Sequence, residues 1–179
     1  MKTRNLVLTG IMAALLAICA WISIPTAVPF TLQTMGVFLA VGILGGKLGS
    51  LAVGVYLLLG AVGLPVFSHF TGGIGALVGT TGGYLLGFLL IALVMWAAEA
   101  LLGKGPMVYL GSAVIGLAVC YLFGSVWYLY LYSAGGGSAD MLTVLGWCVF
   151  PFILPDLIKL ALAFALSRRL SPALSRQRT

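Results

Sequence analysis

Charged residues are scarce in this sequence, where Asp, Glu, Lys and Arg together make up only 7% of the chain. In soluble globular domains these four residue types account for roughly a quarter of all residues. Only three residues are acidic, which leaves little material for a proton relay. This composition excludes an ordinary soluble domain.

The sequence also lacks the common catalytic motifs. The P-loop pattern G-x-x-x-x-G-K-[ST] is absent, because Lys47 and Lys104 are followed by Leu48 and Gly105 rather than by Ser or Thr. No H-E-x-x-H, no G-x-S-x-G and no paired carboxylates occur. We therefore expect no enzyme, and active transport by this chain would take its energy from another subunit.

Three cysteines and one histidine provide neither a disulfide framework nor a metal site. Cys19, Cys120 and Cys148 lie in apolar stretches without C-x-x-C or Cys/His spacing, so we expect small core residues. His69 is the only histidine, and we expect its side chain to face solvent in an outer loop. No cofactor is predicted.

Hydrophobic residues make up 62% of the chain, and the mean hydropathy is +1.21. Several apolar runs are about 20 residues long, which is the length that crosses a hydrocarbon core of ~30 Å. The runs are continuously apolar rather than alternating, which favours helices over a β-barrel. The prediction is an all-α polytopic membrane protein, with residues 1–179 forming one transmembrane domain.

Six transmembrane helices are expected, and Pro and Gly mark most of their ends. The last expected helix carries Pro151 and Pro155 in its interior. An extended, uncharged segment is expected at 25–33, and a glycine-rich one at 66–83. The expected helices are 6–24, 34–45, 48–64, 84–102, 107–132 and 141–170.

The basic residues fit one topology. With six helices both termini share a side, and eight of the nine Lys and Arg residues fall on it, because the loops 25–33, 65–83 and 133–140 contain none. The positive-inside rule then predicts that both termini are cytoplasmic. The net charge of +6 therefore reflects membrane topology rather than nucleic-acid binding.

One acid and one base interrupt the last apolar run, at Asp156 and Lys159. A spacing of three places both side chains on one helix face. Ionisable groups inside a membrane are costly and usually face the bundle interior, a cavity or each other. The pair is either a structural tie between helices or a ligand site, in which a carboxylate accepts and an ammonium donates hydrogen bonds.

The glycine-rich segment precedes the fourth expected helix. Non-helical backbone at membrane depth is tolerated only where protein or a water-filled cavity covers it. The amides and hydroxyls of Thr80, Thr81, Gly82 and Gly83 are therefore candidates to line a cavity. The small-residue spacing through this segment equally fits close helix packing.

Small residues also recur in the first expected helix, as Ala13-x-x-x-Ala17. This spacing leaves a flat strip on which another helix packs closely. The strip faces either this chain's own bundle or a partner.

Four segments together resemble the BioY family, the biotin-specific substrate-binding (S) components of energy-coupling-factor (ECF) transporters. They are VPFTLQTMGVFLA (28–40), YLLLGAVGLPVF (56–67), TGGIGALVGTTGGYLLGF (71–88) and PDLIK (155–159). The T-G-G-Y and D-x-x-K elements in combination are specific. The sequence departs from the family at Thr80, where members often have Pro.

The resemblance implies a single substrate-binding domain in the bacterial cytoplasmic membrane that captures biotin from outside. Its partners would be a transmembrane coupling subunit and two cytoplasmic ATPases. The implied biotin site comprises Asp156, Lys159, Thr81, Gly82, Gly83, Tyr84, Phe67 and Gln33. Pro29, Phe30 and Thr31 would belong to a lid, and Ala13 and Ala17 would contact the partner subunit.

Three rival functions remain open from the sequence. The chain is alternatively an S component for another vitamin, such as thiamine or riboflavin, although the D-x-x-K and T-G-G-Y elements favour biotin. A small channel gated by Asp156 and Lys159 would conduct ions without an ATPase. A structural scaffold would lose stability, but no ligand binding, on Asp156→Asn substitution.

Overall fold

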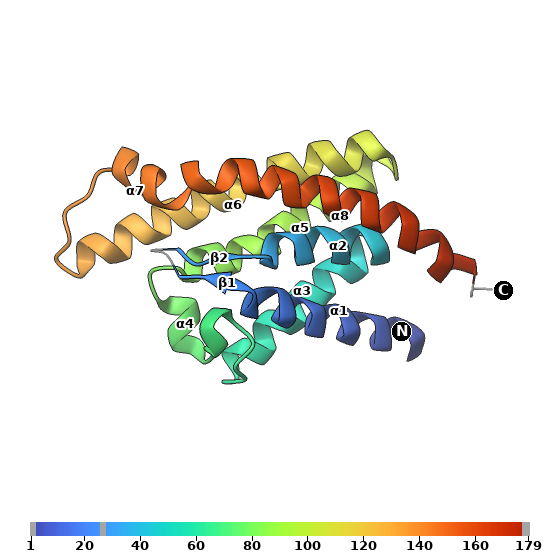
Figure 1. The fold of residues 1–179 in the computed structure, drawn as a ribbon, viewed down its shortest axis with the longest axis horizontal. Helices are drawn as coiled ribbons and strands as arrows, with labels where there is room; N and C mark the ends of the chain where they lie inside the picture. Colours follow the sequence, from blue (N-terminus) through green and yellow to red (C-terminus); the bar gives the residue numbers. More distant parts are fainter. Residues whose placement is uncertain (1–2, 26–27, 177–179) are drawn as a thin grey trace.

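The computed structural model describes residues 3–25 and 28–176, with side chains as far as residue 171. Figure 1 shows an elongated helical bundle, with both ends of the chain at the same end of its long axis. Its elements are α1 (Thr3–Trp21), β1 (Ser23–Ile24), β2 (Phe30–Thr31), α2 (Gln33–Leu44), α3 (Gly46–Ala61), a 3-10 turn (Ser68–Phe70), α4 (Ile74–Val78), α5 (Gly82–Leu102), α6 (Pro106–Ala134), α7 (Met141–Cys148) and α8 (Phe150–Arg176).

The predicted helical segments correspond to α1, α2, α3, α5, α6 and the pair α7–α8. Four helices of the described chain are long and apolar enough to cross a membrane, namely α1, α5, α6 and the Phe150–Ser171 part of α8. The remaining two, α2 and α3, have 12 and 16 residues. At 1.5 Å per residue they extend only about 18 and 24 Å, less than the ~30 Å hydrocarbon core.

The last predicted helix is interrupted, which corrects the prediction of one continuous helix over 141–170. Val149 leaves the helical conformation (φ −125°, ψ −58°) between α7 and α8. The break places Pro151 in the first turn of α8, where its missing N–H costs no intrahelical hydrogen bond. At the other end of α7, Asp140 caps the helix by accepting the Thr143 N–H at 3.0 Å. Hydrogen bonds from the Thr143 side chain and from this N–H hold the pKa of Asp140 below its usual value.

The predicted extended segment takes part in a small antiparallel strand pair. Ser23 pairs with Thr31, and Ile24 with Phe30, so α1 ends at Trp21 rather than continuing to Ile24. The glycine-rich segment is also partly ordered, because it contains the 3-10 turn and the five-residue α4. The segment predicted to be extended therefore contains a strand, and the glycine-rich segment contains short helical structure.

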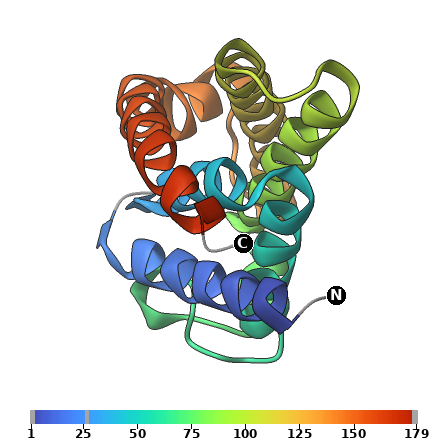
Figure 2. The ribbon, with the colours of Figure 1, turned by 90° about the vertical axis from the view of Figure 1, so that its right-hand side faces the viewer.

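Helix α2 lies at the centre of the bundle. Figure 2, seen from the end where the termini lie, shows it surrounded by α1, α3, α5 and α8, and it contacts all four. A helix that is hydrophobic all round belongs in a core. Its short length and its non-helical continuation into β2 are tolerated because the neighbouring helices cover the backbone.

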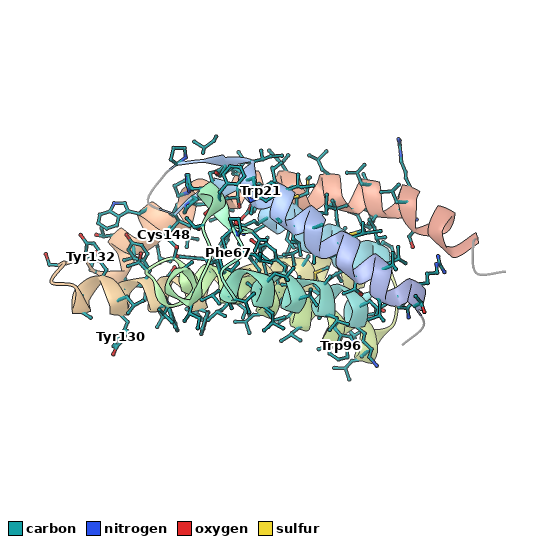
Figure 3. All side chains as sticks on the ribbon, turned by 90° about the horizontal axis from the view of Figure 1, so that it is seen from below. Trp21, Phe67, Trp96, Tyr130, Tyr132 and Cys148 are labelled. Atoms are coloured by element: carbon teal, nitrogen blue, oxygen red, sulfur yellow. The ribbon has the colours of Figure 1, made fainter. Side chains whose placement is uncertain are left out.

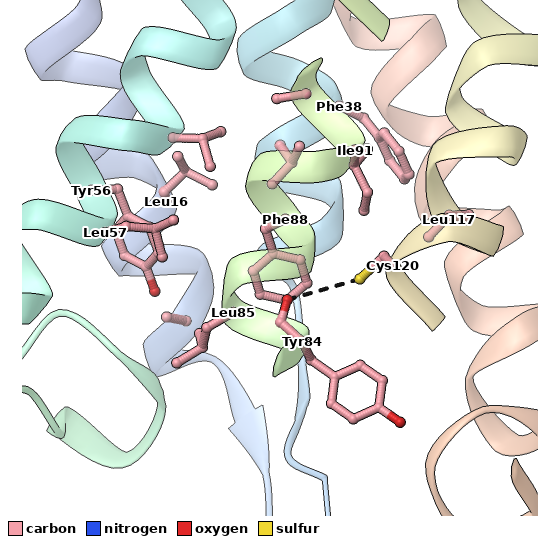
Figure 4. Close-up of a cluster of buried hydrophobic side chains, with 14 of the residues drawn as sticks. Leu16, Phe38, Tyr56, Leu57, Tyr84, Leu85, Phe88, Ile91, Leu117 and Cys120 are labelled. Atoms are coloured by element: carbon pink, nitrogen blue, oxygen red, sulfur yellow. Dashed lines mark hydrogen bonds between the residues drawn. The ribbon is translucent and has the colours of Figure 1, made fainter. Parts of the chain in front are cut away.

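The main core cluster joins side chains from seven helices, namely α1, α2, α3, α5, α6, α7 and α8. Figure 4 shows Leu16 of α1, Phe38 of α2, Tyr56 of α3, Ile91 of α5 and Leu117 of α6 around one buried cluster. The three cysteines are free and buried, as predicted. Within the described residues, no group of three or more His, Cys, Asp or Glu side chains is placed to hold a metal ion.

Indole side chains attach the connecting segments to the bundle. Trp21 Nε1 donates to the Pro65 carbonyl at 2.9 Å, and its ring stacks on Phe70 with centroids 5.0 Å apart. Trp127 Nε1 donates to the Gly79 carbonyl, also at 2.9 Å. In Figure 3 Trp21 lies far from Trp96, which is near the end with the termini. These hydrogen bonds and the ring contact give Trp21 and Trp127 a structural role.

Candidate functional site

The predicted charge pair forms a buried ion pair on α8. Lys159 Nζ donates to Asp156 Oδ1 at 2.8 Å, and the two residues are only 5% and 2% exposed. A buried ion pair is tolerated when further hydrogen bonds satisfy its remaining polar atoms. Both members have such partners.

Asp156 connects three helices through its two carboxylate oxygens. Oδ1 also accepts from the Thr34 hydroxyl of α2 at 2.8 Å, and Oδ2 accepts from the Tyr121 hydroxyl of α6 at 2.5 Å. Charge-assisted hydrogen bonds of this length are among the strong ones in proteins. The carboxylate is therefore fixed in position by donors from α2, α6 and α8.

Lys159 fastens the strand β2 to α8. Its Nζ donates to the Thr31 carbonyl at 2.6 Å and lies 4.3 Å from the centroid of the Phe30 ring. The Phe30 ring stacks in turn on Phe152 of α8, with centroids 5.6 Å apart. Two of the three predicted lid residues are thus held directly by the predicted site lysine.

A separate cavity of about 530 Å³ lies beside the glycine-rich segment, away from the end with the termini. Of the predicted site residues, Gln33, Phe67, Thr81 and Tyr84 line it, together with the lid residue Pro29. Asp156, Lys159, Gly82, Gly83, Phe30 and Thr31 are not among its lining residues. Ser68, His69, Thr71, Gly72, Gly75, Ala76, Gly79, Thr80, Leu85 and Phe88 complete the lining.

Hydrogen bonds and ring packing fix three side chains of the cavity wall. Gln33 Nε2 donates to the Tyr56 hydroxyl at 2.6 Å, and the Tyr56 ring meets the Phe67 ring edge-on with centroids 5.5 Å apart. The hydroxyls of Tyr84 and Ser125 are 3.0 Å apart. The wall is therefore largely preformed, as is usual for small-molecule sites.

The segment 29–33 separates this cavity from the ion pair. Pro29 and Gln33 face the cavity, whereas Phe30 and Thr31 contact Lys159. The Thr31 hydroxyl also donates to Gln33 Oε1 at 2.8 Å. A continuous chain of hydrogen bonds thus runs from the cavity wall through Gln33 and Thr31 to the ion pair.

Gly82 and Gly83 serve helix packing in this structure. The Gly82 N–H donates to the Gly79 carbonyl at 2.9 Å, so it is already occupied. A Cβ atom at Gly82 would overlap the Leu77 backbone, and one at Gly83 would overlap the Trp127 side chain. Close packing, the alternative that the sequence left open, accounts for both glycines, while Thr80 and Thr81 line the cavity as predicted.

The predicted partner-contact residues lie inside the chain. Ala13 and Ala17 are 2% and 5% exposed and belong to the main core cluster. The exposed face of α1 carries larger apolar side chains, among them Val7, Ile11 and Ile18. The small-residue strip therefore packs within this chain's own bundle, the first of its two predicted uses.

A family model described as the BioY family matches residues 1–176. The chain belongs to the BioY family. It is 46% identical over 168 residues to the biotin transporter BioY of Thermotoga maritima, covering 93% of this chain and 95% of the relative. It is 40% identical over 171 residues to the probable biotin transporter BioY of Pyrococcus horikoshii, covering 95% and 98%. These relatives are named as transporters, not as enzymes.

A solved structure also resembles this BioY family member. It is the S-component for biotin from an ECF-type ABC transporter, with a TM-score of 0.82 and 28% sequence identity over 94% of this chain and 91% of the other. Together with the four apolar helices, this similarity identifies a multi-pass membrane protein.

Sequence reasoning missed several polar residues of this BioY chain. The hydroxyls of Thr34 and Tyr121 bind Asp156, and Tyr56 and Ser125 hold cavity-wall residues. Polar side chains inside otherwise apolar helices were the available signal, because a buried hydroxyl needs a hydrogen-bond partner. That signal shows that partners exist but not which residues they are.

Proposed function

We propose that this chain is the biotin-binding S component of an ECF-type ATP-driven transporter, capturing biotin from outside with high affinity for uptake across the membrane. Membership of the BioY family and similarity to a biotin S-component structure support this function. The preformed cavity is the single structural observation that carries it. The absence of a P-loop in the sequence agrees with energy supplied by another subunit.

In this proposal biotin enters the 530 Å³ cavity, whose volume lies within the roughly 300–1,000 Å³ typical of ligand pockets. Phe67 and Tyr84 form apolar walls for the ring system and the aliphatic chain. Thr81 and Gln33 offer a hydroxyl and an amide to polar groups of the ligand. Gly82 and Gly83 contribute by allowing close packing against α4 and α6, respectively.

Asp156 and Lys159 meet the ligand when the segment 29–33 moves as a lid. Lys159 then exchanges its hydrogen bond with the Thr31 carbonyl for a carbonyl or carboxylate oxygen of biotin. Asp156 accepts from an N–H of the ureido group. The hydrogen-bond chain through Gln33 and Thr31 supports this coupling between cavity and ion pair.

The proposed topology has six spans, with residues 1–179 as one domain and both termini cytoplasmic. The location of both chain ends at one end of the bundle supports an even number of crossings. Helices α2 and α3 cross with the help of non-helical segments, which the surrounding helices cover. Basic residues at this end, such as Arg4, Lys104 and Arg168, support a cytoplasmic orientation in a bacterial inner membrane. Lys2 and Arg178, which contribute to this prediction, lie outside the described residues.

The partners in this proposal are a transmembrane coupling subunit and two cytoplasmic ATPases. Contact of the coupling subunit with Ala13 and Ala17 stays a prediction. Their burial implies that a partner reaches them only if α1 shifts within the bundle.

Equilibrium binding of labelled biotin to the detergent-purified chain tests the function. We expect a dissociation constant in the nanomolar range, about −12 kcal/mol. Thr81→Val should weaken binding about fivefold, because it removes one neutral hydrogen bond from the cavity wall. Ser138→Ala, in the exposed loop between α6 and α7, is the matched control and should bind like wild type.

Three outcomes would contradict the proposal. Wild-type protein that ignores biotin but binds thiamine or riboflavin is an S component for another vitamin. Ion conductance in liposomes without any ATPase identifies a channel. A folded chain that binds none of these ligands and conducts no ions is a scaffold.

A further inference from the structure

A second cavity, of about 440 Å³, lies at the end of the bundle where the termini gather. Residues near the ends of α1, α2, α3, α5, α6 and α8 line it. It shares no lining residue with the proposed biotin cavity, so the biotin function leaves it unexplained.

Basic side chains dominate the charge of this cavity. Arg4, Lys104 and Arg168 line it, against the single acid Glu99. Glu99 is already engaged, because Oε1 lies 3.2 Å from Lys104 Nζ and Oε2 accepts the Gly46 N–H at 2.7 Å. The guanidinium of Arg168 lies over the Phe164 ring, 5.5 Å from its centroid, which holds it against the cavity wall. The cavity therefore favours an anion.

The remaining wall is largely apolar, with Val41, Met95 and Phe164 among its lining residues. Beside the turn that carries Lys104, Leu101 and Met107 are 83% and 82% exposed, which places large hydrophobic side chains next to the basic group. A small soluble anion would need only the basic side chains for binding and would leave the apolar wall uncovered. Charges on an apolar cavity that continues into exposed apolar surface match a molecule with an anionic head and hydrocarbon tails.

We infer that this cavity binds an anionic phospholipid of the cytoplasmic leaflet. The phosphate lies by Arg168 and Arg4, the glycerol and the first methylenes enter the cavity, and the rest of the acyl chains cover the exposed side chains by the α5–α6 turn. Basic pockets between transmembrane helices on the cytoplasmic side suit acidic lipid head groups. The choice of the cytoplasmic leaflet rests on the proposed topology, but lipid binding needs no biotin, so this test can fail or succeed separately from the biotin-binding test.

Native mass spectrometry of the detergent-purified chain, titrated with phosphatidylglycerol or phosphatidylcholine, measures the lipid that it retains. We expect wild type to retain phosphatidylglycerol in preference. Arg168→Gln should weaken that retention about fivefold, as expected for one basic residue near an anionic group. Arg169→Gln is the matched control, because Arg169 is exposed and does not line the cavity. Arg168→Lys keeps the charge and should retain most of the binding.

Arg4→Gln removes a second basic side chain, from a different helix, in case Arg168→Gln impairs folding. Thermal unfolding in the absence of lipid shows whether each variant is folded. Equal retention of the two lipids would overturn the inference. So would equal losses in Arg168→Gln and Arg169→Gln, which indicate diffuse surface charge. Displacement of phosphatidylglycerol by soluble glycerol phosphate at matched concentration would assign the cavity to free phosphate esters instead.

Discussion

At the scale of single residues, Asp156 carries an unusual share of the polar structure. Its carboxylate holds donors from α2, α6 and its own helix, and Lys159 fastens β2 to the same place. Removal of one charge of the pair would leave the other residue with a different set of hydrogen-bond partners in each case. Without Lys159, Asp156 keeps two hydroxyl donors. Without a charged Asp156, Lys159 loses its anionic partner and keeps neutral ones, among them the Thr31 carbonyl and the Phe30 ring.

Asp156→Asn should therefore destabilise the fold more than Lys159→Met does. Removal of one partner from a buried ion pair typically costs ~3–5 kcal/mol, because the other charge stays buried without compensation. The double variant removes both charges and should be more stable than the sum of the single losses predicts. Thermal unfolding of the four proteins in detergent measures this.

Strict additivity in the double variant would show that the two side chains do not interact, contrary to their 2.8 Å contact. The same proteins separate structure from binding. A double variant that is folded but no longer binds biotin supports the ligand role, and one that binds normally leaves only the structural role.

Sequence alone predicted the ion pair because the three-residue spacing is visible in one helix. It could not predict the partners, since Thr34 and Tyr121 lie 122 and 35 residues from Asp156 along the chain. An isolated hydroxyl residue in an apolar helix belongs to no periodic sequence pattern, so the sequence does not indicate which residue it hydrogen-bonds to. The family resemblance implied one site for Asp156 and Thr81, and the sequence did not indicate that the segment 29–33 lies between them in this structure.

At the scale of elements, the packing of α5 on α6 positions the cavity wall. Gly124 of α6 lies against the Tyr84 ring, and Ser125 beside it contacts the Tyr84 hydroxyl. The Cys120 thiol faces the Tyr84 carbonyl at 3.8 Å, as Figure 4 shows. Three residues of α6, Cys120, Gly124 and Ser125, thus hold Tyr84 in place.

Gly124→Ala should displace Tyr84, because a Cβ atom there would overlap its ring. Overpacking of this kind typically lowers the free energy of unfolding by roughly 1–3 kcal/mol. We expect a lower unfolding temperature and weaker biotin binding. Gly111→Ala in the same helix is the control, since its Cβ would meet nothing within 4 Å, and it should unfold at or above the wild-type temperature. Equal effects of the two substitutions would show that helix propensity, not contact with Tyr84, decides the outcome.

Apolar runs located the helices well, because membrane helices are defined by composition and length. The break at Val149 and the strand pair of β1 with β2 escaped prediction. Both depend on how a proline or an extended segment is accommodated by neighbours from elsewhere in the chain. The sequence predicted α2 as a short helix but did not indicate that four neighbouring helices enclose it.

At the scale of the whole molecule, the two cavities lie toward different ends of one bundle. The apolar cluster of Figure 4 occupies the interior of that bundle. No Asp, Glu, Lys or Arg is among the lining residues of the first cavity, whereas two Arg and one Lys line the second against one Glu. This difference in charge between the two cavities agrees with the proposals that the protein binds its ligand on one side of the membrane and anionic lipids on the other.

That orientation is testable through the two loops at the ends of α6. With 29 residues the helix extends about 43 Å, enough to cross the ~30 Å core, so we expect the loops to lie on opposite sides of the membrane. Ser138→Cys in the outer loop should react with a membrane-impermeant maleimide in intact cells. Lys104→Cys in the α5–α6 turn should react only after permeabilisation.

The wild-type chain provides the background for this labelling, because its three cysteines are at most 4% exposed and should stay unreactive. The reverse pattern would place the termini outside, in conflict with the distribution of eight basic residues. Reaction at both positions in intact cells would mean that α6 does not cross the membrane. The expected pattern would instead place the basic cavity in the cytoplasmic leaflet, where anionic lipids attract Lys and Arg, and open the uncharged cavity toward the ligand outside.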